Sequence, residues 1–134
     1  ADPGARARLE AILHPQIRDA TAAAALLATG PYLIFAVPLL IESGTWRTRV
    51  NRVLAIDCPE EVQVARVMAR NGMVEAQVRA IMAAQVTRAQ RQAAADDILL
   101  NDDGLDALLP QVERLHAFYL DEAARLASPP NERL

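Results

Sequence analysis

Three short, nearly continuous apolar runs punctuate the chain, at residues 32–38, 52–57 and 97–101. Each is too short for a stable helix and rich in strand-forming side chains, so each predicts a β-strand. Strands without apolar–polar alternation are typical of a sheet that is covered on both faces. Because helical patterns separate these runs, the sequence predicts an α/β fold built on a parallel sheet with helices on both faces.

The N-terminal region carries apolar residues at helical spacing. They predict a first helix over residues 5–13. Pro15 disfavours helical geometry at His14, so we expect the helix to break there. A second helix is predicted to begin near Pro15 and to end at Gly30 and Pro31, which together form a stop signal.

Helical periodicity also dominates the C-terminal half. One helix is predicted over residues 60–71, and another begins at residue 74 and can extend to residue 95. A long amphipathic helix is predicted over residues 105–123, with a break or kink at Pro110. Residues 128–134 are expected to fray.

Composition excludes several kinds of chemistry. All 14 basic residues of this 134-residue chain are arginine, against 17 acidic residues, and the net charge is −3. Without lysine the chain contains no P-loop lysine, Schiff-base lysine or lysine general base. The mild acidity argues against nucleic acid as the main partner. No apolar stretch approaches the roughly 20 residues of a membrane span, and the first ten residues lack the apolar core of a signal peptide.

The number of cysteines indicates the redox compartment, and the length of the chain indicates the number of domains. The single cysteine, Cys58, permits no internal disulfide. Its apolar surroundings indicate a buried thiol in a reducing compartment, for which the cytoplasm is the simplest location. The length predicts one compact domain.

The arginines are unevenly distributed. Residues 62–95 contain five arginines and one acidic residue, a local charge of +4 in a chain of net charge −3. Two same-face pairs have no acid at helical spacing: Arg66 with Arg70, and Arg88 with Arg91. Like charges on one helix face cost a few tenths of a kcal/mol per pair, so an external anion is one explanation, and forked guanidinium groups suit phosphate. A solvated arginine face with acidic partners from elsewhere in the fold explains the pattern equally well.

The other polar candidates carry weaker signals. Glu42 follows the first predicted strand, at the sheet edge where ligands bind, and could hold a substrate group or a metal-bound water. A carboxylate at a helix start is the simpler interpretation, and Asp57 is interpreted in the same way. The aspartate pairs at 96–97 and 102–103 are explained by turns and caps. The lone His14 has neither metal-ligand spacing nor a nucleophile beside it.

Five segments form a specific succession: LxxILHPxIR (9–18), a run ending in VPLLIE (32–42), NRVLAID (51–57), RVMARN (66–71) and AAQVTRAQRxAAADDILLNDDG (83–104). In this order and spacing, which span the chain to about Leu120, they resemble the dephospho-coenzyme A kinase family. The resemblance implies a partial P-loop kinase fold. It also implies transfer of the ATP γ-phosphoryl group, with Mg²⁺, to the ribose 3′-hydroxyl of dephospho-coenzyme A, the last step of coenzyme A synthesis.

The resemblance also divides the chain into regions, as one incomplete kinase domain. It implies substrate-binding helices over residues 1–30, core strands and helices over 31–65, a lid over 66–95, and the last core strand with the C-terminal helix over 96–134. Arg66 and Arg70 would lie at the entrance to the lid, with Arg88 on its returning side, positions that suit ATP phosphates.

Other residues are assigned to the substrates by the same resemblance. The loop after Asn101 would pass near the adenine of ATP, and the acceptor dephospho-coenzyme A would lie near two groups of residues. These are His14, Pro15 and Arg18 in the substrate-binding helices, and Pro38, Leu39, Leu40 and Glu42 after the first predicted strand.

Two parts of the family's machinery are absent from this chain. The GxxxxGK[ST] phosphate loop and the catalytic base lie N-terminal to the matched region, and the five glycines here are isolated. We therefore expect the C-terminal two-thirds or so of such a kinase, inactive by itself. With the strand order 2-3-1-4-5 of related kinases, the missing strand 1 would lie between residues 32–37 and 52–57. These strands would then pair directly, borrow a strand from another copy, or leave open edges prone to self-association.

Two other functions remain compatible with the sequence. One is a related nucleotide or small-molecule kinase with the same lid. The other is a non-catalytic coenzyme A-binding or assembly module, which would bind coenzyme A without turnover.

Overall fold

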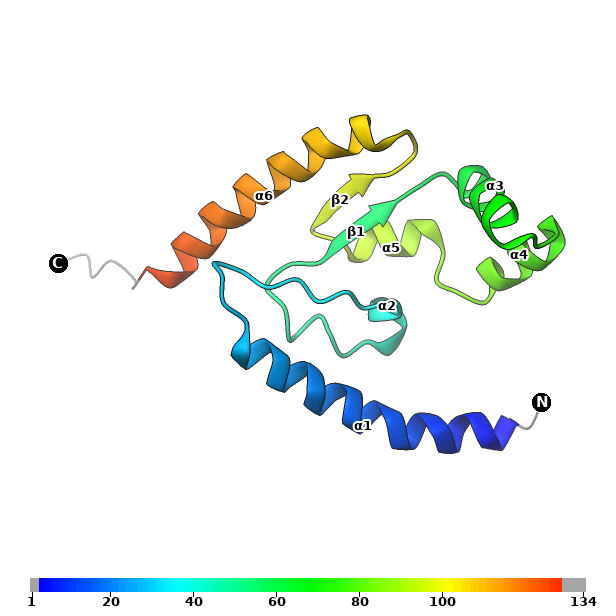
Figure 1. The fold of residues 1–134 in the computed structure, drawn as a ribbon, viewed down its shortest axis with the longest axis horizontal. Coiled ribbons are helices and arrows are strands. Elements are labelled where there is room, and N and C mark those ends of the chain that lie inside the picture. The colour runs from blue at the N-terminus through cyan, green and yellow to red at the C-terminus, as the bar shows by residue number, and fades with distance from the viewer. Residues whose placement is uncertain (1–2, 129–134) are drawn as a thin grey trace. The chain divides into compact units, whose positions relative to one another are not determined.

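The computed structural model describes residues 3–128 and divides the chain into two compact units. Unit 1 takes in the chain up to Phe35 and from Leu120 onward; unit 2 is Ala36–Tyr119. Unit 1 contains helix α1 (Pro3–Leu27) and the end of helix α6 (Leu105–Ala127). The remaining helices and both strands belong to unit 2 (Figure 1). The frayed tail predicted beyond Ser128 lies outside the described residues.

Two of the three predicted strands form a parallel pair. Strand β1 (Leu54–Asp57) aligns with β2 (Asp97–Leu100), with Leu54 opposite Asp97 and Asp57 opposite Leu100. The backbone N–H of Asn101 donates to the Asp57 carbonyl at 2.8 Å and continues the pairing past β2. The α/β class with a parallel sheet is therefore confirmed.

The strand predicted over residues 32–38 is wrong. This segment has no regular secondary structure, and the sheet of residues 3–128 contains only β1 and β2. An apolar run becomes a strand only when a neighbouring strand satisfies its backbone N–H and C=O groups, and the described chain supplies none for it. Direct pairing between residues 32–37 and 52–57, one of the three predicted alternatives, therefore does not occur.

Helices cover both faces of the strand pair. Asp97 lies opposite Leu54, and Asp57 is three residues beyond Leu54, so the two aspartate side chains point to opposite faces. Asp57 binds residues of α5 (Arg88–Ala94), whereas Asp97 accepts a hydrogen bond from Tyr119 of α6. A helix therefore lies on each face, as predicted, but the coverage is incomplete, because Ile56 is 64% exposed on one face and Ile98 is 48% exposed on the other.

Two prolines do not interrupt their helices. The break predicted at His14 is wrong, because α1 runs unbroken through Pro15. A helix-interior proline loses one backbone hydrogen bond, but the alanine-rich sequence that follows has the highest helix propensity available. Helix α6 likewise continues through Pro110, so this proline does not end it.

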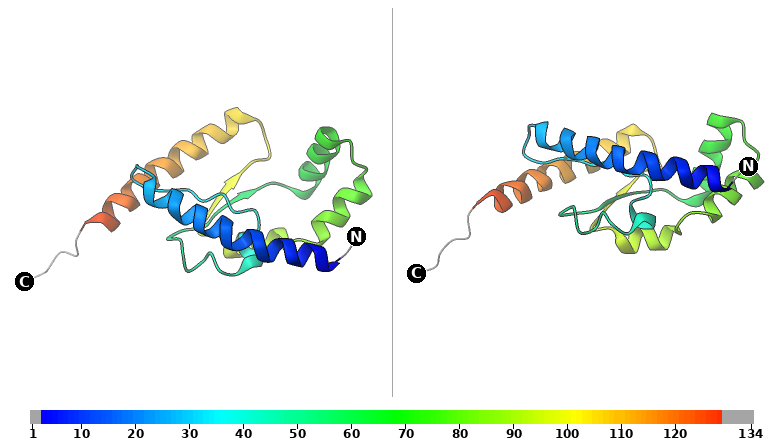
Figure 2. Two further views of the ribbon diagram at one scale, coloured as in Figure 1. Left: turned by 60° about the horizontal axis from the view of Figure 1, so that its bottom comes forward. Right: turned by 90° about the horizontal axis from the view of Figure 1, so that it is seen from below.

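The segment between β1 and β2 is helical, and its sequence signals explain its boundaries. Helix α3 (Glu60–Asn71) ends where predicted: Gly72 adopts φ 65° and its N–H donates to Met68 O at 2.9 Å. Helix α4 (Glu75–Ala83) packs beside α3, as Figures 1 and 2 show. A capping box then starts α5 as a separate helix, because Thr87 and Gln90 bond each other's backbone N–H groups.

The buried core is small. Its apolar members are Val53, Cys58, Val64, Val78 and Leu99, while many larger apolar side chains remain exposed. Cys58 is buried, as predicted. Within residues 3–128, no helix combines the length and the apolar character needed to cross a membrane.

Candidate anion-binding site

A pocket of about 400 Å³ opens at the carboxyl end of the strand pair in unit 2. This is the edge at which open α/β sheets bind ligands. Side chains from β1, α3, α5, the segment between α4 and α5, and the end of β2 line it: Ile56, Cys58, Gln63, Arg66, Val67, Arg70, Gln85, Arg91 and Asn101. No aspartate or glutamate is among these residues, so the lining is strongly positive.

Arg66 fastens α3 to the loop after β2. Its Nη1 donates to the backbone oxygen of Asn101 at 2.7 Å and lies 3.3 Å from the Asn101 Oδ1, and its Nη2 donates to Asp103 O at 3.4 Å. These acceptors are carbonyl oxygens, so they orient the guanidinium without neutralising it. The same contacts bring Asn101 into the pocket beside Arg66.

Arg70 and Arg91 are held in the same way. Arg70 Nε donates to the side-chain oxygen of Asn71 at 2.9 Å, and Arg91 Nη1 donates to Val86 O at 2.7 Å. Across the described part of the chain, neither these two arginines nor Arg66 forms an ion pair with a carboxylate. Three unneutralised guanidinium groups therefore line one pocket.

Arg88 differs from the other three, because it has the acidic partner that the sequence alone left open. Its Nε donates to Asp57 Oδ1 at 2.8 Å and its Nη2 to Oδ2 at 2.6 Å. Gln92 adds a further hydrogen bond to the same carboxylate at 2.9 Å. The Asp57 side chain is only 6% exposed, and the Arg88 guanidinium lowers the pKa of its carboxyl to about 2, with help from Gln92 and against the effect of burial.

Asp57 has a structural role, as the sequence indicated, but it does not act as the carboxylate at the start of α3 that was predicted. The residue preceding α3 is Pro59, and no side chain caps that helix. The Asp57 carboxylate instead holds α5, whose contributing residues lie 31 and 35 positions further along the chain.

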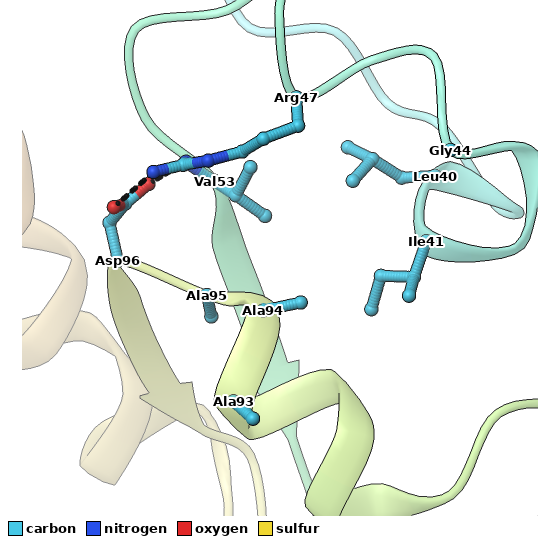
Figure 3. Close-up of a pocket in the computed structure, with 9 residues that line it drawn as sticks. All are labelled: Leu40, Ile41, Gly44, Arg47, Val53, Ala93, Ala94, Ala95 and Asp96. Carbon is cyan, nitrogen blue, oxygen red and sulfur yellow. Dashed lines mark hydrogen bonds and ion pairs between the residues drawn. The ribbon is translucent and has the colours of Figure 1, made fainter.

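A second pocket, of about 300 Å³, lies at the amino end of the strands. Leu40 and Ile41 of α2 (Leu40–Ser43) face the alanines at the end of α5 across it, and Arg47 reaches Asp96 at its edge (Figure 3). The pair is bidentate, with one bond of 2.9 Å, and Asp96 also accepts the Val53 N–H at 2.7 Å. The Arg47 guanidinium lowers the pKa of the Asp96 carboxyl to about 2. The two charged side chains that line this pocket, Arg47 and Asp96, therefore neutralise each other.

Asp97 repeats this arrangement with Arg52. Both Arg52 donors lie 2.8 Å from the Asp97 oxygens, and Tyr119 donates to Oδ2 at 3.0 Å. Arg52 lowers the pKa of the Asp97 carboxyl, and its guanidinium lies 4.8 Å from the centre of the Phe118 ring. The turn-and-cap interpretation is therefore wrong for the pair at 96–97. In the other pair, Asp103 accepts the N–H of Gly104 at 2.8 Å, directly before α6 begins at Leu105.

The predicted acceptor residues do not line the arginine pocket. Glu42 lies in the short helix α2 and accepts the N–H of Val86 at 3.4 Å. Pro38 and Leu39 are exposed just before that helix. His14 and Arg18 are exposed on α1, in unit 1, where Arg18 lies 3.8 Å from Asp19. The structure therefore brings together Arg66, Arg70 and Asn101 from the predicted site, and adds Arg91.

The parallel strands and the pocket at their carboxyl end define the broad class. This is an α/β protein with a parallel strand pair, and three arginines and no carboxylate line the pocket at the carboxyl end of that pair.

The particular family follows from sequence comparison. A family model described as dephospho-CoA kinase matches residues 1–107, and the chain belongs to this family. It is 56% identical over 124 residues to the dephospho-CoA kinase of Dechloromonas aromatica, covering 92% of this chain and 60% of that protein. It is 55% identical over 125 residues to the dephospho-CoA kinase of Burkholderia pseudomallei, covering 92% and 62%.

Structural comparison finds a solved structure with a similar fold. The crystal structure of TT1252 from Thermus thermophilus matches with a TM-score of 0.76 and 30% sequence identity, over 88% of this chain and 61% of that one. The chain thus spans about 60% of the length of the proteins it matches, as expected from the missing phosphate loop.

Proposed function

We propose that the complete protein carrying this chain transfers the γ-phosphoryl group of ATP to the ribose 3′-hydroxyl of dephospho-coenzyme A in the cytoplasm. The observation that carries the proposal is the pocket at the carboxyl end of β1 and β2, in which three arginines meet without a carboxylate. Membership of the dephospho-CoA kinase family supports it.

The pocket suits the demands of phosphoryl transfer. The reaction spreads negative charge over the transferring phosphoryl oxygens, and positioned cations that need no rearrangement stabilise that charge. Arg66 and Arg70 are already oriented by carbonyl oxygens, so they meet an incoming phosphate chain at little entropic cost. We propose that they bind ATP phosphates, as part of a lid segment that also contains Arg88.

Asn101 is the residue we propose near the adenine. Its side-chain oxygen is 3.3 Å from Arg66 Nη1, which leaves its amide N–H groups to donate to a nucleobase. For the acceptor we propose His14, Arg18, Pro38, Leu39 and Glu42. Their support is family membership. Among them, Glu42 has an indirect connection to the arginine pocket, because it accepts the N–H of Val86, whose carbonyl holds Arg91.

Mg²⁺ is proposed only as the ion that accompanies ATP. Residues 3–128 contain no group of three or more histidine, cysteine, aspartate or glutamate side chains arranged to hold a metal ion. We therefore assign no magnesium ligand to them and derive no catalytic step from the ion.

The decisive experiment is an acceptor comparison with the complete gene product. ADP formation is measured with dephospho-coenzyme A and, separately, with adenosine monophosphate as the acceptor. The proposal requires strong preference for dephospho-coenzyme A. Equal or better use of adenosine monophosphate would indicate a related nucleotide kinase, and coenzyme A binding without ADP formation would indicate a binding module.

A further inference from the structure

The two arginines of α5 have different environments, although they lie only three positions apart. Arg88 is bound twice by the buried Asp57 carboxylate and is not part of the pocket lining. Arg91 lines the pocket and donates to a backbone carbonyl. The sequence pattern treats them as one same-face pair, and the structure separates them.

We propose that Arg91 binds the anion together with Arg66 and Arg70, and that Arg88 is a positioning residue whose pairing with Asp57 turns α5 so that Arg91 faces the pocket. The inference rests on the proposed function only in taking the anion to be the phosphate chain of ATP.

Helix geometry explains how the positioning works. Arg88 and Gln92 are four residues apart, so they lie on one face of α5, and both bind Asp57. Two contacts one turn apart on a single buried carboxylate fix the rotation of a seven-residue helix about its axis. Arg91 projects about 60° away from Arg88 around the helix, and this rotation directs it towards the pocket.

Charge explains why Arg88 needs a partner and Arg91 does not. A fourth unpaired guanidinium beside Arg66, Arg70 and Arg91 would add like-charge repulsion without an anion present. The Asp57 carboxylate neutralises the Arg88 guanidinium, so Arg88 adds no net positive charge to this repulsion. Arg91 keeps its full charge, because its acceptor is the neutral carbonyl of Val86.

The loop before α5 supports the same geometry. Val86 accepts from Arg91 through its carbonyl at 2.7 Å, and its N–H donates to Glu42 at 3.4 Å. Thr87 and Gln90 form the capping box that starts the helix. Arg91 is therefore held at its helix and at its guanidinium, as a preorganised ligand group requires.

The test measures binding of inorganic tripolyphosphate and of ATP to the complete gene product by calorimetry. The variants are Arg91→Gln, Arg88→Gln and the double variant, with Arg125→Gln as the control. Arg125 is exposed and pairs with Glu122 on its own helix. Loss of one charge-assisted phosphate contact is expected to raise the Kd of Arg91→Gln about tenfold, with its melting temperature close to that of the unaltered protein.

The double variant decides the role of Arg88. If Arg88 acts through Arg91, the double variant binds no more weakly than Arg91→Gln alone. A further tenfold loss would show that Arg88 contacts the anion itself and would overturn the proposal. An unchanged Kd in Arg91→Gln would overturn it as well.

Two conservative substitutions distinguish loss of the Arg88–Asp57 pairing from general misfolding of the variant. Arg88→Lys keeps one ionic contact with Asp57 and is expected to restore most of the affinity that Arg88→Gln loses. Asp57→Asn is expected to weaken tripolyphosphate binding, because Arg91 loses its support. Tighter binding in Asp57→Asn would show that a released Arg88 joins the pocket, contrary to the proposal.

These outcomes are separable from the proposed function. Tripolyphosphate binding that depends on Arg91, in a protein that does not phosphorylate dephospho-coenzyme A, would refute the proposed function and retain the inference. If the protein phosphorylates dephospho-coenzyme A but Arg91→Gln leaves the Kd for tripolyphosphate unchanged, the proposed function is retained and the inference about Arg91 is refuted.

Discussion

The arginines at the amino end of the β1–β2 pair are held in the opposite way to those that line the pocket at its carboxyl end. At the amino end, Arg47 and Arg52 each bind an aspartate with two donors. At the carboxyl end, the arginines that line the pocket donate to uncharged acceptors among residues 3–128. The first arrangement holds β1, β2 and α6 together by paired charges. In the second, Arg66 fastens α3 to the loop after β2, but the positive charges stay unneutralised.

This difference separates arginines that are paired with a carboxylate from those for which we propose a ligand. An arginine that already has a buried carboxylate partner gains little from an anion, because binding the anion would mean leaving that partner. An arginine held by carbonyl oxygens keeps both its orientation and its charge for a ligand. We infer that the acceptor bound to each guanidinium, rather than its position in the sequence, indicates its use.

The largest expected effect is on catalysis at the carboxyl end. In the complete gene product, Arg66→Gln should lower kcat/KM for ATP about 100-fold, because it removes a preorganised cation from the transferring phosphoryl group. Steady-state kinetics with dephospho-coenzyme A measure it, with Arg125→Gln as the control. A loss of less than about threefold would show that the pocket does not hold the reacting phosphates.

Lowering the pH should remove the stabilisation that the Asp57 and Asp96 ion pairs give to the folded chain. The pKa values of Asp57 and Asp96 are lowered to about 2 in the folded chain, against 3.8 for an unperturbed aspartate. Their contribution to the free energy of unfolding is therefore complete above about pH 4 and is lost as the pH falls towards 2. Urea unfolding of the chain at pH 6, 4 and 3 should show this loss. Asp57→Asn should reduce the slope between pH 4 and pH 3, and an unaltered slope would contradict the assigned pairing.

A single substitution at the amino end should cost stability rather than affinity. Arg52→Gln leaves the mostly buried Asp97 carboxylate with Tyr119 as its remaining side-chain donor. Loss of a charge-assisted pair of this kind costs about 2 kcal/mol of unfolding free energy. Urea unfolding at pH 7 measures it, and tripolyphosphate binding by the same variant should be unchanged. Weaker binding would mean that the two ends are not independent.

The sequence predicted what depends on local signals. The apolar runs around β1 and β2 and the Asn71–Gly72 stop of α3 were found because their cues lie within the elements themselves. The separate start of α5 was missed, although the Thr87–Gln90 capping box stands in the sequence.

Distant partners account for the main errors. Residues 32–38 have the composition of a strand, but strand formation needs a neighbour that no local pattern supplies. Arg88 and Arg91 look alike in the sequence because the partner that distinguishes them, Asp57, lies 31 residues before Arg88. The arginine-rich segment was therefore predictable as a candidate site, whereas the division of roles within it was not.

The smallest expected effect on stability is that of Arg70→Gln, and it directly tests the contrast between the arginines at the two ends of the strand pair. Within the described part of the chain, Arg70 donates to its neighbour Asn71 alone, and it lies in the last turn of α3. Arg70→Gln loses a favourable interaction with the helix dipole and relieves repulsion from Arg66, and each of these is worth a few tenths of a kcal/mol. The free energy of unfolding should therefore change by less than about 0.5 kcal/mol, while tripolyphosphate binding weakens. A loss above about 1 kcal/mol would show that this arginine is structural, and the contrast between the two ends would fail at that residue.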